Sequence, residues 1–252
     1  MKTYVIGDIH GGLKALQQLI QKVTLRPTDH LIFLGDYVDG WSDAAATIDY
    51  LINLAKQYTC IFIKGNHDIW CQEWLEGTAN NELWLAHGGS ATVTSYAALS
   101  DKERTAHLAF FRSMLPYYID SEQRLFIHAG FTSMHGVHKE TFTKNFHFDR
   151  TLWETALAAH QIHEIDDYYP ERLRHYKEIY IGHTPTTRYK QSTPMRATNV
   201  WNIDTGAAFK GRLSMLDIEN KSFWQSDPVY QLYPTETGRN KSPYKLIKTK
   251  KS

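Results

Sequence analysis

Short apolar runs recur along the first part of the chain, each followed by a polar turn and an amphipathic stretch. Residues 3–6 form the first run, and apolar residues then recur at helical spacing over 13–23. The same unit repeats with apolar runs at 30–34 and 60–64. Alternating strands, polar turns and helices are typical of an α/β sheet with helices on its faces. In such sheets, ligands gather at the carboxyl ends of the strands.

Further strands are expected in the rest of the chain, at 117–120, 124–127, 178–181, 200–203 and 212–218. Residues 83–115 are predicted to be mostly helical, with a loop at 88–90. Ser100 and Glu103 have capping-box spacing at the start of a helix in this segment. Residues 131–177 show no clear periodicity apart from a helix expected at 151–159.

The polar, Lys-rich stretch from Pro234 onward is typical of a frayed end. We therefore predict a single domain over residues 1–233 and a flexible tail over 234–252. A chain of 252 residues with 42% hydrophobic and 22% charged residues fits one globular domain.

The composition also limits partners and location. A net charge of +1 gives no overall attraction to nucleic acid or membranes, so neither is expected as a partner. Cys60 and Cys71 are too few for a disulfide framework. The chain begins without the pattern of a signal peptide, which makes a cytoplasmic location the expectation. The oligomeric state is not set by any of these features.

Six expected strands end in an acidic or metal-capable side chain beside or near a glycine: Asp8, Asp36, Asn66, His128, His183 and Asp204. One such residue alone is more often a hydrogen-bonded structural group, but six that can converge favour metal binding. Carboxylates, imidazoles and an amide oxygen suit divalent manganese, iron or zinc, and they suffice for two ions with Asp36 as the bridge. Two ions roughly 3.5–4 Å apart can generate hydroxide at neutral pH and stabilise a phosphoryl group.

Five motifs in this order resemble those of the calcineurin-like metallophosphoesterases: GDIHG at 7–11, GDYVDG at 35–40, GNHD at 65–68, HAG at 128–130 and GHT at 182–184. The stretch WLAHGGSAT at 84–92 is similar to one in the bacterial PPP phosphatases, relatives of diadenosine tetraphosphate hydrolases. The resemblance covers residues 3–218.

The resemblance implies a metallophosphoesterase-type α/β fold, in which β-sheets pack as a sandwich flanked by helices and two metal ions lie at the strand ends. Manganese is expected, with iron, zinc or nickel as alternatives. The implied ligands are Asp8, His10 and Asp36 for the first ion, and Asp36, Asn66, His128 and His183 for the second.

The same resemblance makes His67 the general acid that protonates the leaving group and Asp39 the residue that orients it. It implies direct phosphoryl transfer to a hydroxide that bridges the metals, without a covalent intermediate. His67 could instead be a hydrogen-bond partner of the ligands. Asp204 is expected either to contact the ligands or only to form a turn, and Asp68 to cap a helix.

One departure concerns the substrate phosphate. Relatives with protein-phosphatase activity usually carry an arginine where this chain has Gly40, and a second one after a Leu-Trp pair, where Leu152 and Trp153 are followed by Glu154. Planar, bidentate arginine contacts are hard to replace. The candidates to replace them, or to contact substrate otherwise, are Arg150, Arg174, Arg188, Trp41 and Ser42.

Three functions follow as hypotheses. The leading one is a PPP-type serine/threonine phosphatase that hydrolyses phosphate monoesters on phosphoproteins. The alternative is a hydrolase of dinucleoside polyphosphates or other small phosphoesters, which the missing arginine favours. The third is a non-catalytic, metal-bound interaction module, and the presence of His67 and Asp39 argues against it.

Overall fold

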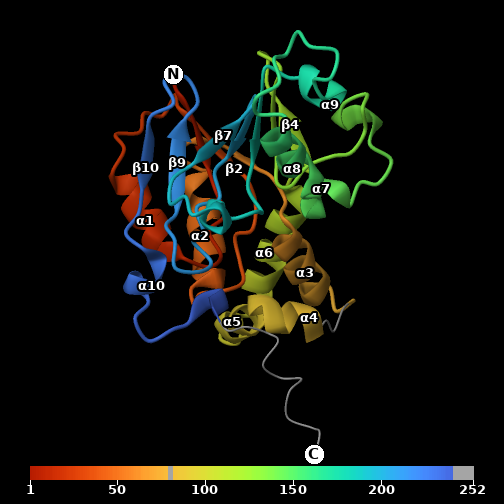
Figure 1. The fold of residues 1–252 in the computed structure, drawn as a ribbon. Helices are drawn as coiled ribbons and strands as arrows, with labels where there is room; N and C mark the ends of the chain where they lie inside the picture. Colours follow the sequence, from red (N-terminus) through yellow and green to blue (C-terminus); the bar gives the residue numbers. More distant parts are fainter. Residues whose placement is uncertain (79–81, 241–252) are drawn as a thin grey trace, which may run out of the picture.

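Two five-stranded sheets form the centre of the molecule in the computed structural model, which describes residues 1–78 and 82–240 (Figure 1). In their order across the first sheet, the strands are β10 (Phe223–Gln225), β9 (Ser214–Asp217), β1 (Thr3–Ile6), β2 (His30–Phe33) and β3 (Thr59–Phe62). Across the second sheet they are β4 (Tyr117–Ile119), β5 (Arg124–Ile127), β6 (Glu178–Ile181), β8 (Val200–Asn202) and β7 (Met195–Ala197).

The central strands of each sheet are parallel, and the outer ones are antiparallel. Strand β1 pairs with β2 and β2 with β3 in parallel register, as do β5 with β6 and β6 with β8. Strands β9, β10, β4 and β7 add antiparallel pairs. Because parallel strands end at the same edge, the polar turns after β1, β2 and β3 lie together, and so do those after β5, β6 and β8.

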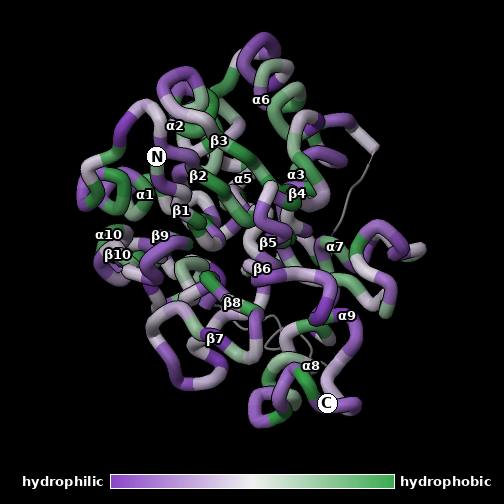
Figure 2. The backbone as a smooth tube through the Cα atoms, turned by 90° about the horizontal axis from the view of Figure 1, so that it is seen from above, coloured by the Kyte–Doolittle hydropathy of each residue, from purple (hydrophilic) through white to green (hydrophobic). Residues whose placement is uncertain are grey.

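An apolar layer between the sheets joins them into a sandwich. Val5 and Ile32 of the first sheet pack in one buried cluster with Phe126 and Tyr180 of the second. The rings of Phe126 and Tyr180 stack with centroids 5.0 Å apart. Figure 2 shows the two sets of strands side by side, with apolar segments in the strands and more polar backbone around them.

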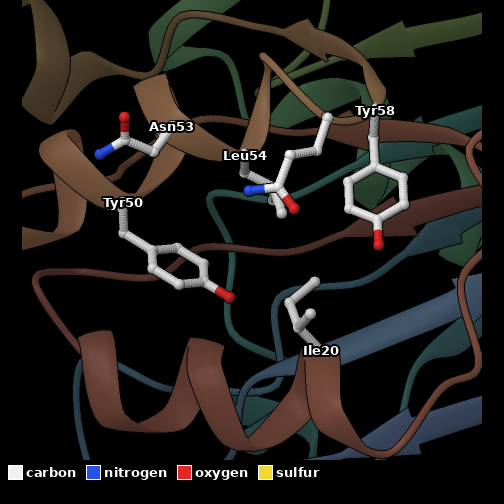
Figure 3. A pocket seen from close by; sticks show the side chains of 6 residues that line it. Ile20, Tyr50, Asn53, Leu54 and Tyr58 are labelled. Atoms are coloured by element: carbon white, nitrogen blue, oxygen red, sulfur yellow. The ribbon is translucent and has the colours of Figure 1, made fainter.

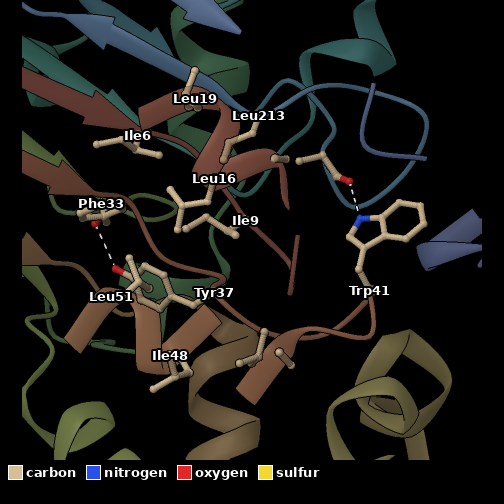
Figure 4. Packing of buried hydrophobic residues seen from close by; sticks show 14 of the residues in the cluster. Ile6, Ile9, Leu16, Leu19, Phe33, Tyr37, Trp41, Ile48, Leu51 and Leu213 are labelled. Atoms are coloured by element: carbon tan, nitrogen blue, oxygen red, sulfur yellow. Dashed lines mark hydrogen bonds between the residues drawn. The ribbon is translucent and has the colours of Figure 1, made fainter. Parts of the chain in front are cut away.

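Helices cover the outer face of each sheet, because strand side chains alternate between the two faces. The helices and helical turns, in chain order, are α1 (Leu13–Gln21), α2 (Ala44–Leu54), α3 (Asn66–Leu75), α4 (Glu82–Trp84), η1 (Leu85–Gly89), α5 (Ser90–Ser95), α6 (Asp101–Ser113), η2 (Val137–Lys139), α7 (Asn145–Phe148), α8 (Thr151–Ala158), α9 (Glu171–Arg174), η3 (Thr186–Tyr189), α10 (Val229–Leu232) and η4 (Gly238–Asn240). Leu16 of α1 and Ile48 of α2 pack with Phe33 on the outer face of the first sheet (Figure 4). Leu152 and Trp153 of α8 cover the second sheet in the same way.

The structure confirms most of the expected elements. Strands β1, β5 and β6 have the predicted bounds, helix α8 differs by one residue at its end, and the Ser100–Glu103 capping box is formed. The expected loop at 88–90 is instead a kinked π-helical turn in which Gly88 has φ of 115°. Strands β7 and β10 were not expected, because each is a short edge strand without an apolar run.

Residues 234–240, which the sequence assigns to a polar tail, pack against the body of the protein. Ser42 donates two hydrogen bonds to Glu236, and the Arg239 N–H donates to the Ala208 carbonyl. In Figure 1, the blue segment after α10 returns toward the region of α5. Helical turn η4 in this segment contacts η1. The rest of the expected tail, 241–252, lies outside the described residues.

A shallow pocket of about 140 Å³ lies between α1 and α2. Ile20 comes from α1, Tyr50 and Leu54 from α2, and Tyr58 from the residue directly before β3 (Figure 3). This is the amino-terminal edge of the parallel strands, opposite the turns where ligands are expected. Among the described residues, no helix is long and apolar enough to cross a membrane.

Candidate metal centre and active site

The turns after six strands bring their polar side chains together where the two sheets meet. Asp8, Asp36 and Asn66 follow β1, β2 and β3, while His128, His183 and Asp204 follow β5, β6 and β8. The first four of these are less than 5% exposed to solvent. The predicted convergence of the strand ends is therefore present in the structure.

His10 presents its free ring nitrogen to two carboxylates. Its Nδ1 lies 2.8 Å from the Asp39 carbonyl oxygen, which can only accept, so Nδ1 carries the proton. The Nε2 atom then has a lone pair that faces Asp8 Oδ2 at 3.9 Å and Asp36 Oδ2 at 3.6 Å. A neutral imidazole that is oriented by a backbone carbonyl is the usual form of a metal-ligating histidine.

His128 is arranged in the same manner on the other side of Asp36. Its Nδ1 donates to the Leu34 carbonyl at 2.7 Å, which leaves Nε2 as an acceptor. That atom lies 3.4 Å from Asp36 Oδ1, 3.3 Å from Asn66 Oδ1 and 3.2 Å from His183 Nδ1. Electron-rich atoms at these distances stabilise each other poorly unless a cation lies among them.

The electrostatics of the cluster favour divalent cations. Burial, together with the charges of Asp204 and Asp36, raises the pKa of Asp8 well above its usual value. Burial also raises the pKa of Asp36 to about 7 and lowers that of His128 to about 3. Neutral imidazoles and crowded carboxylates are the protonation states that a bound cation would stabilise. The donor set thus fits two metal ions, with Asp36 shared between the groups His10–Asp36 and Asp36–His128–His183.

Glycines make room for the two carboxylates. A Cβ atom on Gly65 would lie 2.1 Å from Asp36 Oδ1, and one on Gly182 would lie 2.1 Å from Asp8 Oδ1. His10, Asp36 and His183 have φ of 54°, 54° and 65°, in the left-handed region that costs energy for residues other than glycine. Such strained backbone persists only where the surrounding structure holds it, and it clusters at functional sites.

Asp68 holds the turn that carries Asp36. The sequence analysis expected Asp68 to cap α3, and it does accept the N–H of Gly65 at 2.8 Å. It also accepts the N–H groups of Asp36 at 2.8 Å and Tyr37 at 2.9 Å. These contacts cross from α3 to the turn after β2, so local sequence patterns alone could not have revealed them.

His67 and Asp39 form the predicted pair. His67 Nδ1 lies 2.7 Å from Asp39 Oδ2. Asp39 also accepts hydrogen bonds from Trp84 Nε1 and Thr92 Oγ1, both at 2.6 Å. These donors belong to the WLAHGGSAT stretch, which therefore supports the carboxylate that orients His67. A ligand atom of His67 also lies within 4.8 Å of those of His10 and Asp36, so the geometry permits metal binding by His67 as well.

Asp204 forms a turn and lies within electrostatic range of Asp8. Its Oδ1 accepts the N–H of Gly206 at 2.9 Å, as a turn-forming aspartate does. Its charge is also the second-largest cause of the raised pKa of Asp8, after burial. Burial raises the pKa of Asp204 itself to about 6.

The aromatic and hydroxyl candidates for substrate contact are engaged elsewhere. Trp41 is fully buried, donates from Nε1 to the Ala207 carbonyl at 2.8 Å (Figure 4) and stacks on Tyr233 at 5.3 Å. Ser42 is bound to Glu236. Trp41 therefore packs in the core, contrary to the expectation that it touches substrate.

Of the predicted arginines, Arg150 lies nearest to the cluster. It donates to Thr184 Oγ1 at 2.7 Å, and its charge acts on Asp36 and Asp204. Arg188 is exposed and lies within electrostatic range of Arg150. Arg174 donates to the carbonyl oxygens of Glu164 and Asp166 and so stabilises a loop instead.

Arg239 lies at the site although the sequence analysis assigned it to the tail. Its charge acts on Asp8, Asp36, Asp39 and Asp204. The one sequence signal that points to it is indirect, namely the absence of a side chain at Gly40.

Known proteins resemble the chain over most of its length. The family model described as calcineurin-like phosphoesterase matches residues 1–205. A bis(5'-nucleosyl)-tetraphosphatase (asymmetrical) of Halalkalibacterium halodurans is 29% identical over 258 residues, covering 95% of this chain and 99% of that protein. A protein of the same description from Oceanobacillus iheyensis is 26% identical, with 88% and 91% covered.

Two solved structures show the same fold at low sequence identity. A metallophosphoesterase from Sphaerobacter thermophilus aligns with a TM-score of 0.55 at 14% identity, covering 93% of this chain and 95% of that one. A protein serine/threonine phosphatase from Saccharomyces cerevisiae aligns with a TM-score of 0.60 at 12% identity, covering 90% and 80%. The likeness of this chain to these two structures agrees with the fold class expected from the sequence, two sheets packed as a sandwich and flanked by helices.

Proposed function

The chain belongs to the calcineurin-like phosphoesterase family, so it is a metal-dependent phosphoric ester hydrolase, and from this premise we propose that it cleaves dinucleoside polyphosphates. The reaction class is supported by the hydrogen-bond acceptors of Asp36, Asn66 and His183 that face His128 Nε2, an arrangement that a bound divalent cation would stabilise. The substrate class rests on the relatives named as bis(5'-nucleosyl)-tetraphosphatases, which match the chain almost from end to end.

The proposed metal ligands are those expected from the sequence: Asp8, His10 and Asp36 for one ion, and Asp36, Asn66, His128 and His183 for the other. We propose manganese, with iron, zinc or nickel as alternatives, since a mixed nitrogen and oxygen donor set accepts several divalent ions. When bound, two such ions lower the pKa of a water molecule and offset negative charge on the phosphoryl oxygens.

Other residues are proposed to protonate the leaving group and to bind the substrate phosphate. Asp39 accepts the Nδ1 proton of His67 and so fixes the ring, which leaves Nε2 to carry the proton that the leaving oxygen takes. Trp84 and Thr92 hold Asp39 in place. Arg150 is proposed to bind phosphate from the second sheet, because it is half-buried beside His183.

An aromatic pair beside His67 supports a nucleotide as the leaving group. The Trp70 ring lies 5.0 Å from that of His67, and the Phe148 ring lies 5.8 Å from that of Trp70. Phe148 is 38% exposed. A leaving group protonated by His67 would extend past Trp70, where a nucleobase could stack on the exposed face of Phe148.

Hydrolysis of phosphoproteins, the leading hypothesis from the sequence, is the second candidate function. It is supported by the order of the PPP-type motifs, including the 84–92 stretch that supports Asp39. A non-catalytic module is not proposed, since the chain belongs to a family of phosphoesterases and the His67–Asp39 pair is formed. The cytoplasmic location expected from the sequence remains part of the proposal.

The deciding experiment has two stages. Metal-stripped protein is assayed on para-nitrophenyl phosphate with and without manganese, beside Asp36→Asn, and we expect activity that manganese restores and the substitution removes. Turnover of diadenosine tetraphosphate is then compared with that of a phosphoserine peptide. Faster turnover of the dinucleotide supports the proposal, and faster turnover of the peptide supports the second candidate.

A further inference from the structure

The side chain of Arg239 passes between Gly40 and Gly88, two residues without side chains, toward the proposed metal ligands. A Cβ atom on Gly40 would lie 3.5 Å from Arg239 Cγ, and one on Gly88 would lie 3.2 Å from the same atom. Gly40 and Gly88 have φ of 135° and 115°, conformations that residues with side chains rarely adopt. The aliphatic part of Arg239 thus lies beside the position where a side chain on residue 40 would begin.

The charged end of Arg239 lies near the carboxylates of the cluster and has no hydrogen-bond or ion-pair partner within the described part of the chain. No hydrogen bond or ion pair involves its guanidinium in residues 1–78 and 82–240, and its Cζ lies 5.4 Å from the centre of the Phe209 ring. Burial lowers the pKa of the guanidinium, whereas the charges of Asp36, Asp39 and Asp204 raise it. Five N–H donors are therefore held near the proposed metal ligands without being used there.

The residues directly after Gly40 anchor the segment that carries Arg239. Ser42 binds both carboxylate oxygens of Glu236, at 2.9 Å from its N–H and 2.7 Å from its hydroxyl. Asp43 accepts a hydrogen bond from the Tyr233 hydroxyl at 2.6 Å. A Cβ atom on Gly238 would lie 2.6 Å from the Trp41 ring, so the backbone at 238 rests directly on that ring.

We propose that Arg239 binds the substrate phosphate at this site, supplied by the C-terminal segment in place of a side chain at position 40. It acts from the side of the first sheet, and Arg150 acts from the side of the second. The segment that carries Arg239 is held by the Glu236–Ser42 and Tyr233–Asp43 hydrogen bonds and rests on the buried Trp41 ring, so the guanidinium is preorganised, which lowers the entropic cost of binding a phosphate through two N–H donors. The proposal rests on the phosphoesterase activity proposed above.

The test compares Arg239→Ala and Arg239→Lys with wild type and with Arg112→Ala, a control at an exposed arginine paired with Glu76. With manganese-loaded protein, we expect Arg239→Ala to raise KM for para-nitrophenyl phosphate and to weaken binding of inorganic phosphate, measured calorimetrically, by about 10–100-fold. Lysine should recover part of the loss, and added guanidinium ion should recover part of it in the alanine variant. Arg112→Ala should match wild type.

Manganese binding separates a role in phosphate binding from a structural one. A cation near the metal ligands opposes metal binding, so Arg239→Ala should bind manganese as tightly as wild type or more tightly. Unchanged KM and phosphate affinity in the alanine variant would overturn the proposal, as would loss of manganese binding in both the alanine and lysine variants. If wild type itself hydrolyses no phosphoester with any metal, the proposed function fails, and calorimetry with inorganic phosphate still tests Arg239.

Discussion

The metal side and the phosphate side of this site are built in different ways. The proposed metal ligands Asp8, Asp36 and His183 lie just after strand ends, in turns where glycine permits the backbone to bend. The proposed phosphate-binding residues are Arg150, directly before α8, and Arg239 of η4, and their segments are held by contacts between distant parts of the chain. The positions of the proposed metal ligands are fixed by the order of strands in the sheets, whereas those of Arg150 and Arg239 depend on contacts between distant segments. We therefore expect the phosphate-binding residues to vary more easily in evolution.

The largest effect is expected from Gly65→Ala on the metal side. The new Cβ would lie 2.1 Å from Asp36 Oδ1 and 2.5 Å from the Asp36 backbone nitrogen, so the carboxylate must move. We expect a loss of about 3 kcal/mol in the free energy of unfolding and loss of bound metal. Gly77→Ala is the control, since that position faces open space and costs only about 1 kcal/mol for its φ of 72°. Equal metal content in the two variants would contradict the tight fit around Asp36.

Asp39→Asn tests the residue at the boundary of the two sides. The amide cannot accept from His67, Trp84 and Thr92 together, so His67 loses its fixed orientation. We expect kcat to fall about 100-fold with metal content unchanged. Thr92→Val, which removes one of the donors, should lower kcat by less. A fall in metal content that parallels the fall in kcat would show instead that this pair supports the metals.

Phe148→Ala probes the substrate side alone. If a base stacks on this ring, KM for diadenosine tetraphosphate should rise about 10-fold, because base–aromatic stacking contributes about 1–3 kcal/mol. KM for para-nitrophenyl phosphate should change little. Phe142→Ala is the matched control, since Phe142 lies in the same connection and is 73% exposed. Equal effects on both substrates would exclude a specific contact with a base.

The smallest effect is expected from Glu140→Gln, in the connection that leads to Phe148. Desolvation would raise the pKa of Glu140, but hydrogen bonds from Thr132, Ser133 and Phe142 outweigh it and lower the pKa to about 2. Because the folded pKa lies below the usual 4.5, the ionised group stabilises the fold above about pH 4.5, and this contribution disappears as the pH falls toward 2.

Urea denaturation measures this contribution. The glutamine variant should be about 1–2 kcal/mol less stable than wild type at pH 7, and the difference should narrow below about pH 4.5. Glu154→Gln, at an exposed position on α8, serves as the control. A difference that stays constant with pH would assign the effect to geometry and not to charge.

The contrast between the two sides also explains what the sequence could predict. Each proposed metal ligand lies within a short motif whose glycine and strand are its neighbours in sequence, so local patterns locate it. Asp68 and Trp41 illustrate the limit, because their partners Asp36 and Gly238 are distant in the chain and only folding brings them together. Arg239 was missed for the same reason, since a polar, Lys-rich context is typical of a solvated end.

The docking of Glu236 and Arg239 onto Ser42 and Ala208 sets an order of events during synthesis. All proposed metal ligands precede residue 184, whereas strands β7 to β10 of the two sheets and Arg239 follow it. The stretch between His183 and Arg239 takes several seconds to translate at about 5–20 residues per second. Strands β9 and β8, which pair with β1 and β6, and Arg239 are therefore all supplied only in that interval, so the proposed metal ligands and Arg239 gain their folded arrangement late and nearly together.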